Sequence, residues 1–111
     1  MNGYSDVLGK YVLMSYRKGR RLEYVVRDMF RRRGWFVVRA AASKPVDLVC
    51  LKSGEIVLVE CKYGVKGVRW AELAPLLEAA EKADARPVLV IAEKRGRVKM
   101  IDVGRWTDFK P

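Results

Sequence analysis

The sequence predicts an α/β fold, with a mixed sheet of five strands flanked by helices. One observation is an apolar stripe of helical period between Lys18 and Arg33, which ends at Gly34. A second is a pair of strand-like runs joined by Ser53-Gly54, and a third is a later helical segment followed by two more strand-like runs. Elements in this order bury their apolar faces as layers around one core.

The chain has 111 residues, so we expect a single domain over residues 1–111. Ser5 is placed to cap a short helix, and we expect residues 1–16 to form an extra N-terminal helical segment, although Gly9 disfavours a helix. The stripe of the main helix has the spacing i, i+3, i+4, i+7 and i+8: Leu22, Val25, Val26, Met29 and Phe30. Glu23 lies at the edge of this stripe, where the core should meet solvent.

Five runs rich in β-branched and other apolar residues predict the strands. They cover residues 35–40, 46–52, 55–62, 87–93 and 97–103, and Gly96 marks the last turn. A helix is expected over residues 69–84, where Pro75 predicts a separate or kinked first turn.

The charge of +10 and the pI near 10 indicate a polyanionic partner, either nucleic acid or an anionic membrane surface. Residues 1–40 hold 10 Lys and Arg against 3 Asp and Glu, a net charge of +7. This first third is therefore the predicted surface for a phosphate backbone, and the alternative is a solvated basic face kept for solubility.

The composition also excludes several classes. The chain has no His, which removes every mechanism built on an imidazole base or a His metal ligand. No apolar run is long enough to span a membrane and no signal peptide is recognisable, so we expect a soluble, cytoplasmic protein. The absence of Gln, the single Asn and the abundant Arg are typical of heat-adapted proteins.

Three charged residues on two neighbouring strands form the candidate catalytic cluster. If the Ser-Gly pair is a two-residue hairpin loop, Lys52 faces Glu55 and Asp47 faces Glu60. Opposed carboxylates repel unless a cation or a proton lies between them. Alternation along the strand places Lys62 on the same face as Glu60.

Two carboxylates and a lysine suit phosphodiester hydrolysis with Mg²⁺, which takes oxygen ligands, while the lysine orients water or stabilises charge. Glu23 is a candidate third carboxylate. The alternative is an inert ion-pair group at the end of the sheet, and a bulge that shifted the register by one residue would turn Asp47 away. Cys50 and Cys61 are predicted too far apart for a disulfide, and two Cys without His do not complete a zinc site.

The order and spacing of these residues resemble a known family. Asp47, then 12 residues, then Glu60-Cys61-Lys62 resembles the P-D…(D/E)-x-K nuclease signature. The chain is further similar to the archaeal Holliday junction resolvase family over residues 17 to 105, through these segments: Lys18-Gly19, Glu23, Val37-Val38-Arg39-Ala40 and Ala42-Ser43.

The resemblance implies a restriction-endonuclease-like sheet and a metal-dependent, homodimeric endonuclease that cuts four-way DNA junctions in recombination and repair. It implies that Glu23, Asp47 and Glu60 bind Mg²⁺ or Mn²⁺, that Lys62 assists the attacking water and that Ser43 contributes to cleavage. Cys61, inside the Glu-x-Lys motif, is counted with the metal residues. Other readings remain open, namely the same chemistry on flaps or nicks, or a DNA-binding protein without catalysis.

The chain departs from the family pattern at three places. Pro45-Val46-Asp47 has one residue inserted in the Pro-Asp pair, and the loop from Ala40 to Pro45 is short. Glu72, followed by Pro75, stands where the family has a Gln.

Basic residues around the predicted site are candidates for binding DNA phosphates. They are Arg17, Lys18, Arg20, Arg21, Arg31, Arg32, Arg39, Lys44, Lys66 and Arg69. Trp70, Trp106 and Phe109 are candidates for stacking on bases or opening a junction, and the alternative for them is a role in the core or in dimer contacts.

Overall fold

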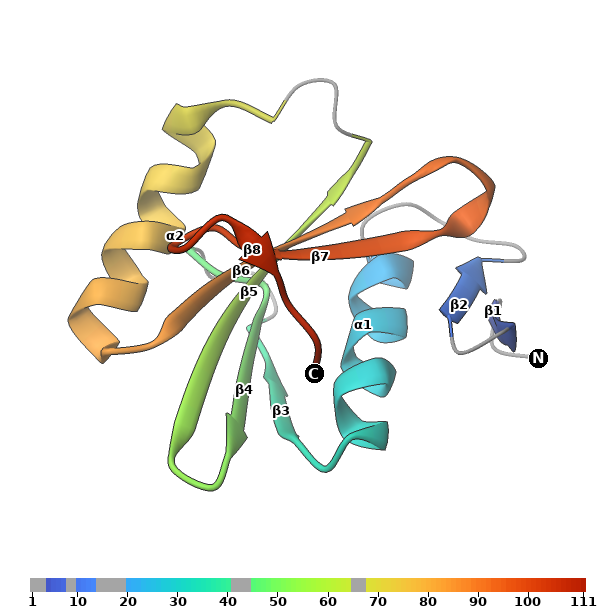
Figure 1. Ribbon diagram of the computed structural model, residues 1–111, viewed down its shortest axis with the longest axis horizontal. Helices are drawn as coiled ribbons and strands as arrows, with labels where there is room; N and C mark the ends of the chain where they lie inside the picture. The colour runs from blue at the N-terminus through green and yellow to red at the C-terminus, as the bar shows by residue number, and fades with distance from the viewer. Residues whose placement is uncertain (1–3, 8–9, 14–19, 41–44, 65–67) are drawn as a thin grey trace.

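The computed structural model describes residues 4–7, 10–13, 20–40, 45–64 and 68–111, and the side chains from residue 21 onward within those ranges (Figure 1). The elements run in this order: β1 (Tyr4–Val7), β2 (Lys10–Leu13), α1 (Arg20–Arg32), β3 (Phe36–Arg39), β4 (Leu48–Lys52), β5 (Glu55–Tyr63), α2 (Trp70–Ala83), β6 (Arg86–Ala92), the 3₁₀ turn η1 (Lys94–Gly96), β7 (Val98–Asp102) and β8 (Thr107–Asp108).

The main sheet has the strand order β3-β4-β5-β6-β7-β8. Strands β5 and β6 pair in parallel, with α2 as the crossover between them, and every other neighbouring pair is antiparallel. The mixed sheet is therefore as predicted. It has six strands where five were expected, because the short β8 adds to the edge of β7.

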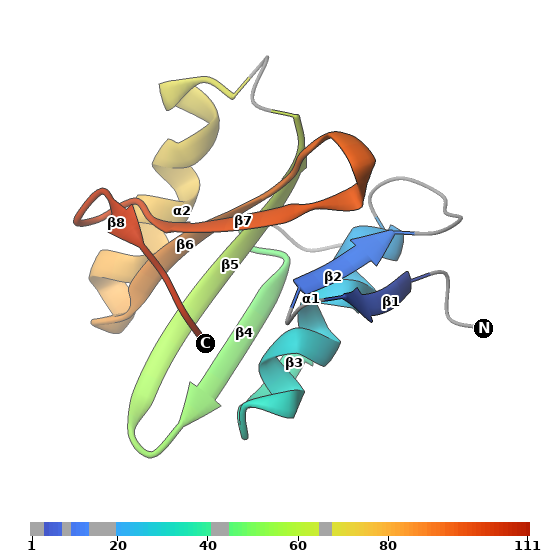
Figure 2. The same ribbon diagram turned by 45° about the vertical axis from the view of Figure 1, so that its right-hand side comes forward.

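The two helices cover opposite faces of this sheet, so the chain forms three layers with a core on each side (Figures 1 and 2). On one side α1 packs Leu22, Val25 and Phe30 against the sheet, in the stripe that the sequence predicted. On the other side α2 packs Leu73 and Leu76. The central strands β5 and β6 are consequently covered on both faces.

The expected N-terminal helix is wrong. Residues 4–7 and 10–13 form the antiparallel pair β1–β2, which includes the pairs Ser5↔Val12 and Asp6↔Tyr11. Tyr and Val favour strands, and Gly9 separates two such runs, so local preference supports a hairpin over a helix. The parts of the expected segment at 1–3, 8–9 and 14–16 lie outside the described residues.

The predicted β4–β5 hairpin is confirmed, with Lys52 paired to Glu55 and Leu48 to Val59. Its two loop residues both have positive φ, 48° at Ser53 and 84° at Gly54, as a type I′ turn requires. Pro75 lies inside α2, which continues through it, so the expected separate first turn is not formed. No described helix is long and apolar enough to cross a membrane.

Candidate active site

Asp47 lies immediately before β4 and is 3% exposed. Its N–H donates to the carbonyl of Val59 at 2.8 Å, although Val59 is already paired with Leu48. Asp47 and Leu48 therefore both lie opposite Val59, which is the arrangement of a β-bulge. The bulge also explains why Val46 packs in the α2-side core while Leu48 packs in the α1-side core.

This bulge corrects the predicted register at one position. Asp47 was expected to face Glu60 directly, but its carboxylate Oδ2 accepts the backbone N–H of Cys61 at 2.8 Å. The inserted residue in Pro45-Val46-Asp47 is thus absorbed where the strand begins. The Asp47 side chain is anchored to the backbone of β5, one residue beyond Glu60.

Glu60 is buried on β5, with 7% of its surface exposed, and its Oε2 lies 3.6 Å from Nζ of Lys62. Lys62 makes a shorter contact of 3.0 Å with Oε1 of Glu72, in the first turn of α2. The hydrogen bond that Lys62 donates to Glu72, and then the charges of both glutamates, raise the pKa of Lys62 against the lowering effect of burial. Lys62 is therefore held as a cation between two carboxylates.

Glu23 lies in the first turn of α1, on the edge of the buried stripe as the sequence predicted. Its Oε1 accepts a hydrogen bond of 2.8 Å from Nε of Arg39 on β3. Arg39 was predicted to bind DNA, but its guanidinium is engaged here, over the ring of Tyr24 at 5.2 Å. The helix carboxylate is thus fixed to the sheet.

The thiol of Cys61 reports how close the three acids lie. Burial raises its pKa first, and the charges of Asp47, Glu23 and Glu60 raise it further, in that order. All three predicted carboxylates therefore act electrostatically on one point of β5. A raised pKa keeps the thiol protonated at neutral pH, and its sulfur is not the oxygen ligand that Mg²⁺ prefers.

The donor set fits a hard divalent cation, since Mg²⁺ prefers carboxylate oxygens and Asp47 and Glu60 are both buried at neighbouring strand positions. Within the described ranges, however, no three Asp, Glu or Cys side chains are already grouped around a point that would hold a metal ion. Of the three predicted carboxylates, that of Glu23 forms an ion pair with Arg39. The carboxylates of Asp47 and Glu60 are ligands of the kind that Mg²⁺ takes.

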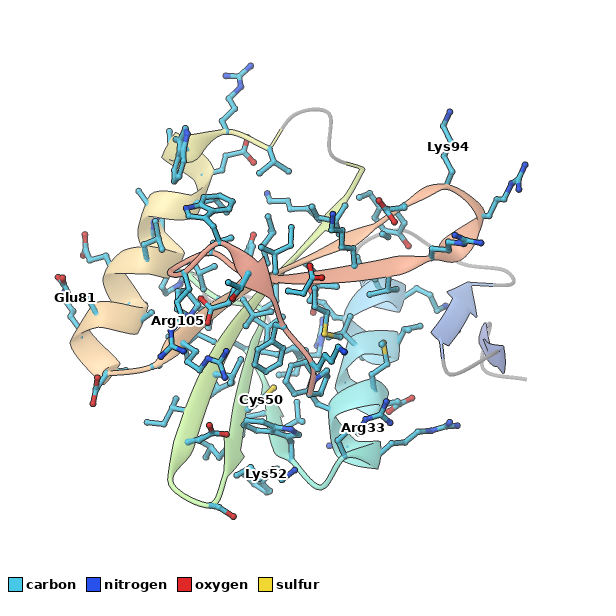
Figure 3. All side chains as sticks on the ribbon, in the orientation of Figure 1. Arg33, Cys50, Lys52, Glu81, Lys94 and Arg105 are labelled. Carbon is cyan, nitrogen blue, oxygen red and sulfur yellow. The ribbon has the colours of Figure 1, made fainter. Side chains whose placement is uncertain are left out.

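Those predicted basic residues whose side chains the structure describes do not form one group. Arg31 and Arg32 are exposed in the last turn of α1, about 13 Å along the helix from Glu23. That end of α1 lies beside the β4–β5 turn, where Lys52 donates to the carbonyl of Arg33 (Figure 3). Other candidates are near the site: Arg69 is exposed at the start of α2, and Arg21 is half-buried near Glu23 in sequence.

Several predicted residues cannot be placed. Arg17, Lys18, Ser43, Lys44 and Lys66 lie outside the described residues, and of Arg20 only the backbone, at the start of α1, is described. The contact between Lys62 and Glu72 was not predicted. Its only sequence signal was that an acidic residue replaces the family's Gln.

Two helices on opposite faces of a mixed sheet, with buried acids and a lysine on its central strands, define an α/β domain of the restriction-endonuclease-like class. The family model of the archaeal Holliday junction resolvase (Hjc) matches residues 14–107. The chain belongs to the archaeal Holliday junction resolvase family.

Two relatives illustrate this membership. The crossover junction endodeoxyribonuclease Hjc of Methanocaldococcus jannaschii is 32% identical over 79 residues, which are 68% of this chain and 59% of that protein. The chain thus matches less than two thirds of that relative's length. The structure of Archaeoglobus fulgidus Hjc, a Holliday junction resolvase from an archaeal hyperthermophile, has a TM-score of 0.69 at 19% identity, covering 79% of this chain and 75% of that chain. This likeness confirms the predicted fold.

Proposed function

We propose that this protein is a structure-selective DNA endonuclease that hydrolyses phosphodiester bonds at four-way junctions with Mg²⁺ or Mn²⁺. The observation that carries the proposal is that Asp47 accepts the N–H of Cys61, the residue between Glu60 and Lys62 on β5, with both acids buried. Buried carboxylates are costly unless they are paired or bind a cation. The charge of +10 also agrees with a DNA substrate. We propose that the protein acts in the cytoplasm.

The roles of the residues follow from their contacts. Asp47 and Glu60 would hold the metal, and the Cys61 N–H fixes the orientation of the Asp47 carboxylate. When bound, Mg²⁺ or Mn²⁺ supplies positive charge against the phosphate and makes water easier to deprotonate. Glu23 would supply a third carboxylate, at the expense of its ion pair with Arg39.

Lys62 has a separate task. Its ammonium stays protonated between Glu60 and Glu72, so it donates hydrogen bonds and does not act as a base. From that position it would orient the attacking water and stabilise the negative charge that develops on the phosphate. The expected products are a 5′-phosphate and a 3′-hydroxyl. We also propose that Ser43 contributes to cleavage, as the family resemblance implies.

We further propose that the active form is a homodimer, since symmetric cutting of a four-way junction needs two sites. Apolar side chains remain exposed on β3 and β4 beyond the edge of α2, where Phe36 is 66%, Val38 45% and Leu51 37% exposed. Such a patch is typical of a protein contact. Sedimentation velocity tests this: a Phe36→Asp variant should sediment as a monomer, and an unchanged dimer would remove this patch from the interface.

A substrate panel tests the activity. Protein and Mg²⁺ are incubated with labelled four-way junction, flap, nicked duplex and linear duplex, beside Glu60→Gln. The matched control is Glu55→Gln, which changes an exposed glutamate at the other end of β5. We expect wild type and Glu55→Gln to nick the junction in preference to linear duplex, and Glu60→Gln to bind the junction without cutting it.

Other outcomes have defined meanings. Equal cutting of linear duplex would reject junction selectivity and leave a nuclease. Junction binding without metal-dependent cutting by the wild type would favour a DNA-binding protein that has lost catalysis. Preferential cutting of flaps or nicks would favour the same chemistry on another DNA structure.

A further inference from the structure

Two tryptophans that the proposed chemistry does not use stand exposed on one side of the molecule. Trp70 is 65% exposed and Trp106 is 54% exposed, and their ring centroids are 5.2 Å apart at an interplanar angle of 74°. Phe109, which the sequence grouped with them, is only 5% exposed and stacks on Phe30 at 5.8 Å between centroids. Phe109 therefore belongs to the core, and the two tryptophans do not.

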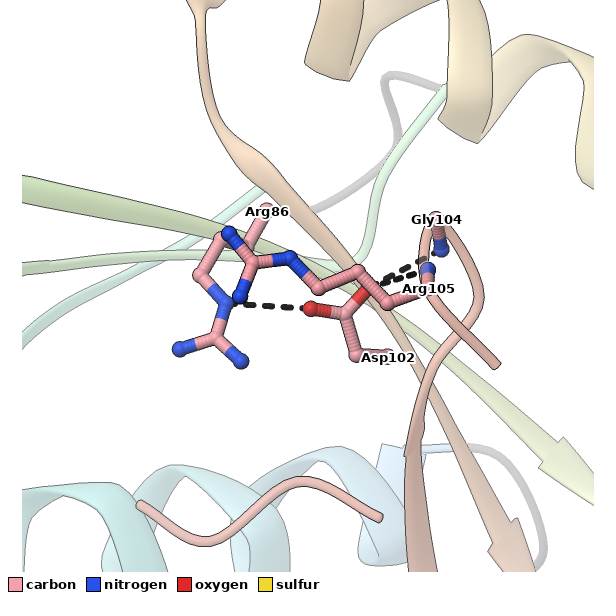
Figure 4. Close-up of polar contacts among 4 residues, drawn as sticks. All are labelled: Arg86, Asp102, Gly104 and Arg105. Atoms are coloured by element: carbon pink, nitrogen blue, oxygen red, sulfur yellow. Dashed lines mark hydrogen bonds and ion pairs between the residues drawn. The ribbon is translucent and has the colours of Figure 1, made fainter. Parts of the chain in front are cut away.

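The backbone that carries Trp106 is strongly fixed. Trp106 has a φ of 57°, a left-handed conformation that is rare for a bulky side chain and that is kept only when surrounding contacts impose it. Its N–H donates to the carbonyl of Asp102 at 2.7 Å. The Asp102 carboxylate, 1% exposed, accepts the N–H groups of Gly104 and Arg105 at 2.9 and 3.2 Å and Nε of Arg86 at 3.0 Å (Figure 4).

The first turn of α2 links the pair to the candidate active site. Trp70 opens α2, and Glu72 in the same turn contacts Lys62 at 3.0 Å. Arg69 and Arg105, both exposed, are the chain neighbours of the two tryptophans. Exposed aromatic rings with arginines as their neighbours in the sequence match the chemistry of unpaired nucleic acid, in which bases stack on aromatic rings and phosphates bind arginine.

We propose that Trp70 and Trp106 form an aromatic platform that stacks on an unpaired base of the DNA substrate next to the cleaved phosphate. In an edge-to-face pair, the ring whose edge meets its neighbour keeps both of its own faces open for a base. The platform would select branched DNA, because bases in a continuous duplex are already stacked. The inference rests on the proposed function, since it places the base relative to Lys62.

Binding without cleavage tests the platform. The probe is a four-way junction with 2-aminopurine at the branch point, compared with a linear duplex carrying the same base, both in EDTA. Trp70→Leu and Trp106→Leu keep an apolar side chain but remove the ring, and Trp106→Phe keeps a ring. The control is Glu55→Gln, which changes an exposed side chain at the far end of β5, away from both tryptophans and from the exposed patch on β3 and β4.

We expect both tryptophan-to-leucine variants to bind the junction about 5-fold to 100-fold more weakly, the scale of losing one stacked base. Duplex affinity should stay within about twofold, since the phosphate contacts remain. Trp106→Phe should rescue most of the loss, and Glu55→Gln should bind like wild type. Junction binding should also quench the protein fluorescence from Trp70 and Trp106, while the buried Trp35 keeps its emission.

Three results would overturn the platform: unchanged junction affinity in both leucine variants, equal losses on junction and duplex, or dissociation of a wild-type dimer by either variant, which would assign the pair to a second copy of the chain. These failures are distinct from failure of the proposed function. If wild type cuts the junction and the leucine variants bind it normally, only the platform is wrong. If wild type neither binds nor cuts the junction, the proposed function is wrong as well.

Discussion

Asp102 is predicted to be the most costly polar side chain to remove outside the active site. Its buried carboxylate accepts two backbone N–H groups in the turn that leads to Trp106, together with Nε of Arg86. Asp102→Ala removes all three acceptor contacts. It leaves two backbone donors without their partner in a place that solvent reaches poorly.

The magnitude follows from these contacts. Hydrogen bonds to charged groups contribute about 1.5–3 kcal/mol each, so two backbone donors at the lower end give a loss of about 3 kcal/mol. The Arg86 contact adds little, because that side chain is 34% exposed and water replaces its partner. For a domain of this size, about 3 kcal/mol lowers Tm by about 12–24 °C.

Urea denaturation and calorimetry measure this loss. Asp102→Asn keeps an oxygen acceptor and should lose about 1 kcal/mol, consistent with a neutral hydrogen bond. Asp108→Ala, an exposed aspartate on β8, is the matched control and should change stability by less than about 0.5 kcal/mol. A stability for Asp102→Ala equal to that of the control would refute the reasoning that the carboxylate holds the turn.

Three further predictions concern the site and the core. Glu72→Gln still offers Lys62 an acceptor and should change the junction-cleavage rate by less than about threefold. Glu72→Ala releases the Lys62 ammonium and should slow cleavage about tenfold. Equal rates for both variants would show that Glu72 does not position Lys62. Burial raises the pKa of Cys50 to about 12 and raises that of Cys61 as well, so neither thiol should react with a disulfide reagent at pH 8 until urea unfolds the protein; rapid reaction of the native protein would contradict this. Phe109→Ala should destabilise the fold by about 3 kcal/mol in urea, because its ring packs in the α1-side core, and a change below about 1 kcal/mol would contradict that packing.

Most of the fold could be predicted because its signals are local. The apolar spacing of α1 depends only on residues within four positions of one another, and the structure buries Leu22, Val25 and Phe30 as that spacing requires. The Ser53-Gly54 loop fixes the register of β4 and β5 by turn geometry, which acts over two residues. Such features do not depend on the rest of the chain.

The errors arise where distant contacts decide. β8 exists because two residues add to the edge of β7, whereas the hairpin of β1 and β2 was a local signal that the prediction of a helix misread. The bulge at Asp47 depends on the carbonyl of Val59, and no residue pattern within β4 announces it. Exposure is also a tertiary property, so the sequence could not separate Phe109 from Trp106.

At the candidate site, too, local features could be predicted and contacts between distant elements could not. The sequence predicted that Lys62 shares the face of Glu60, because residues two apart on a strand point the same way, and their contact of 3.6 Å agrees. It did not predict the partners, because Arg39 reaches Glu23 and Glu72 reaches Lys62 from other elements. These ion pairs set how the site is held before a metal binds.

The rate at which a labelled four-way junction is nicked under single-turnover conditions, with Mg²⁺ and with EDTA, tests the shared role of Asp47 and Glu60 most directly. We predict that wild type and Glu55→Gln cut only with Mg²⁺, and that Asp47→Asn and Glu60→Gln each lose about 100-fold or more in rate, the scale of removing a group that stabilises the transition state. Wild-type cutting in EDTA, or a normal rate in either variant, would contradict a metal-dependent site built on these two carboxylates.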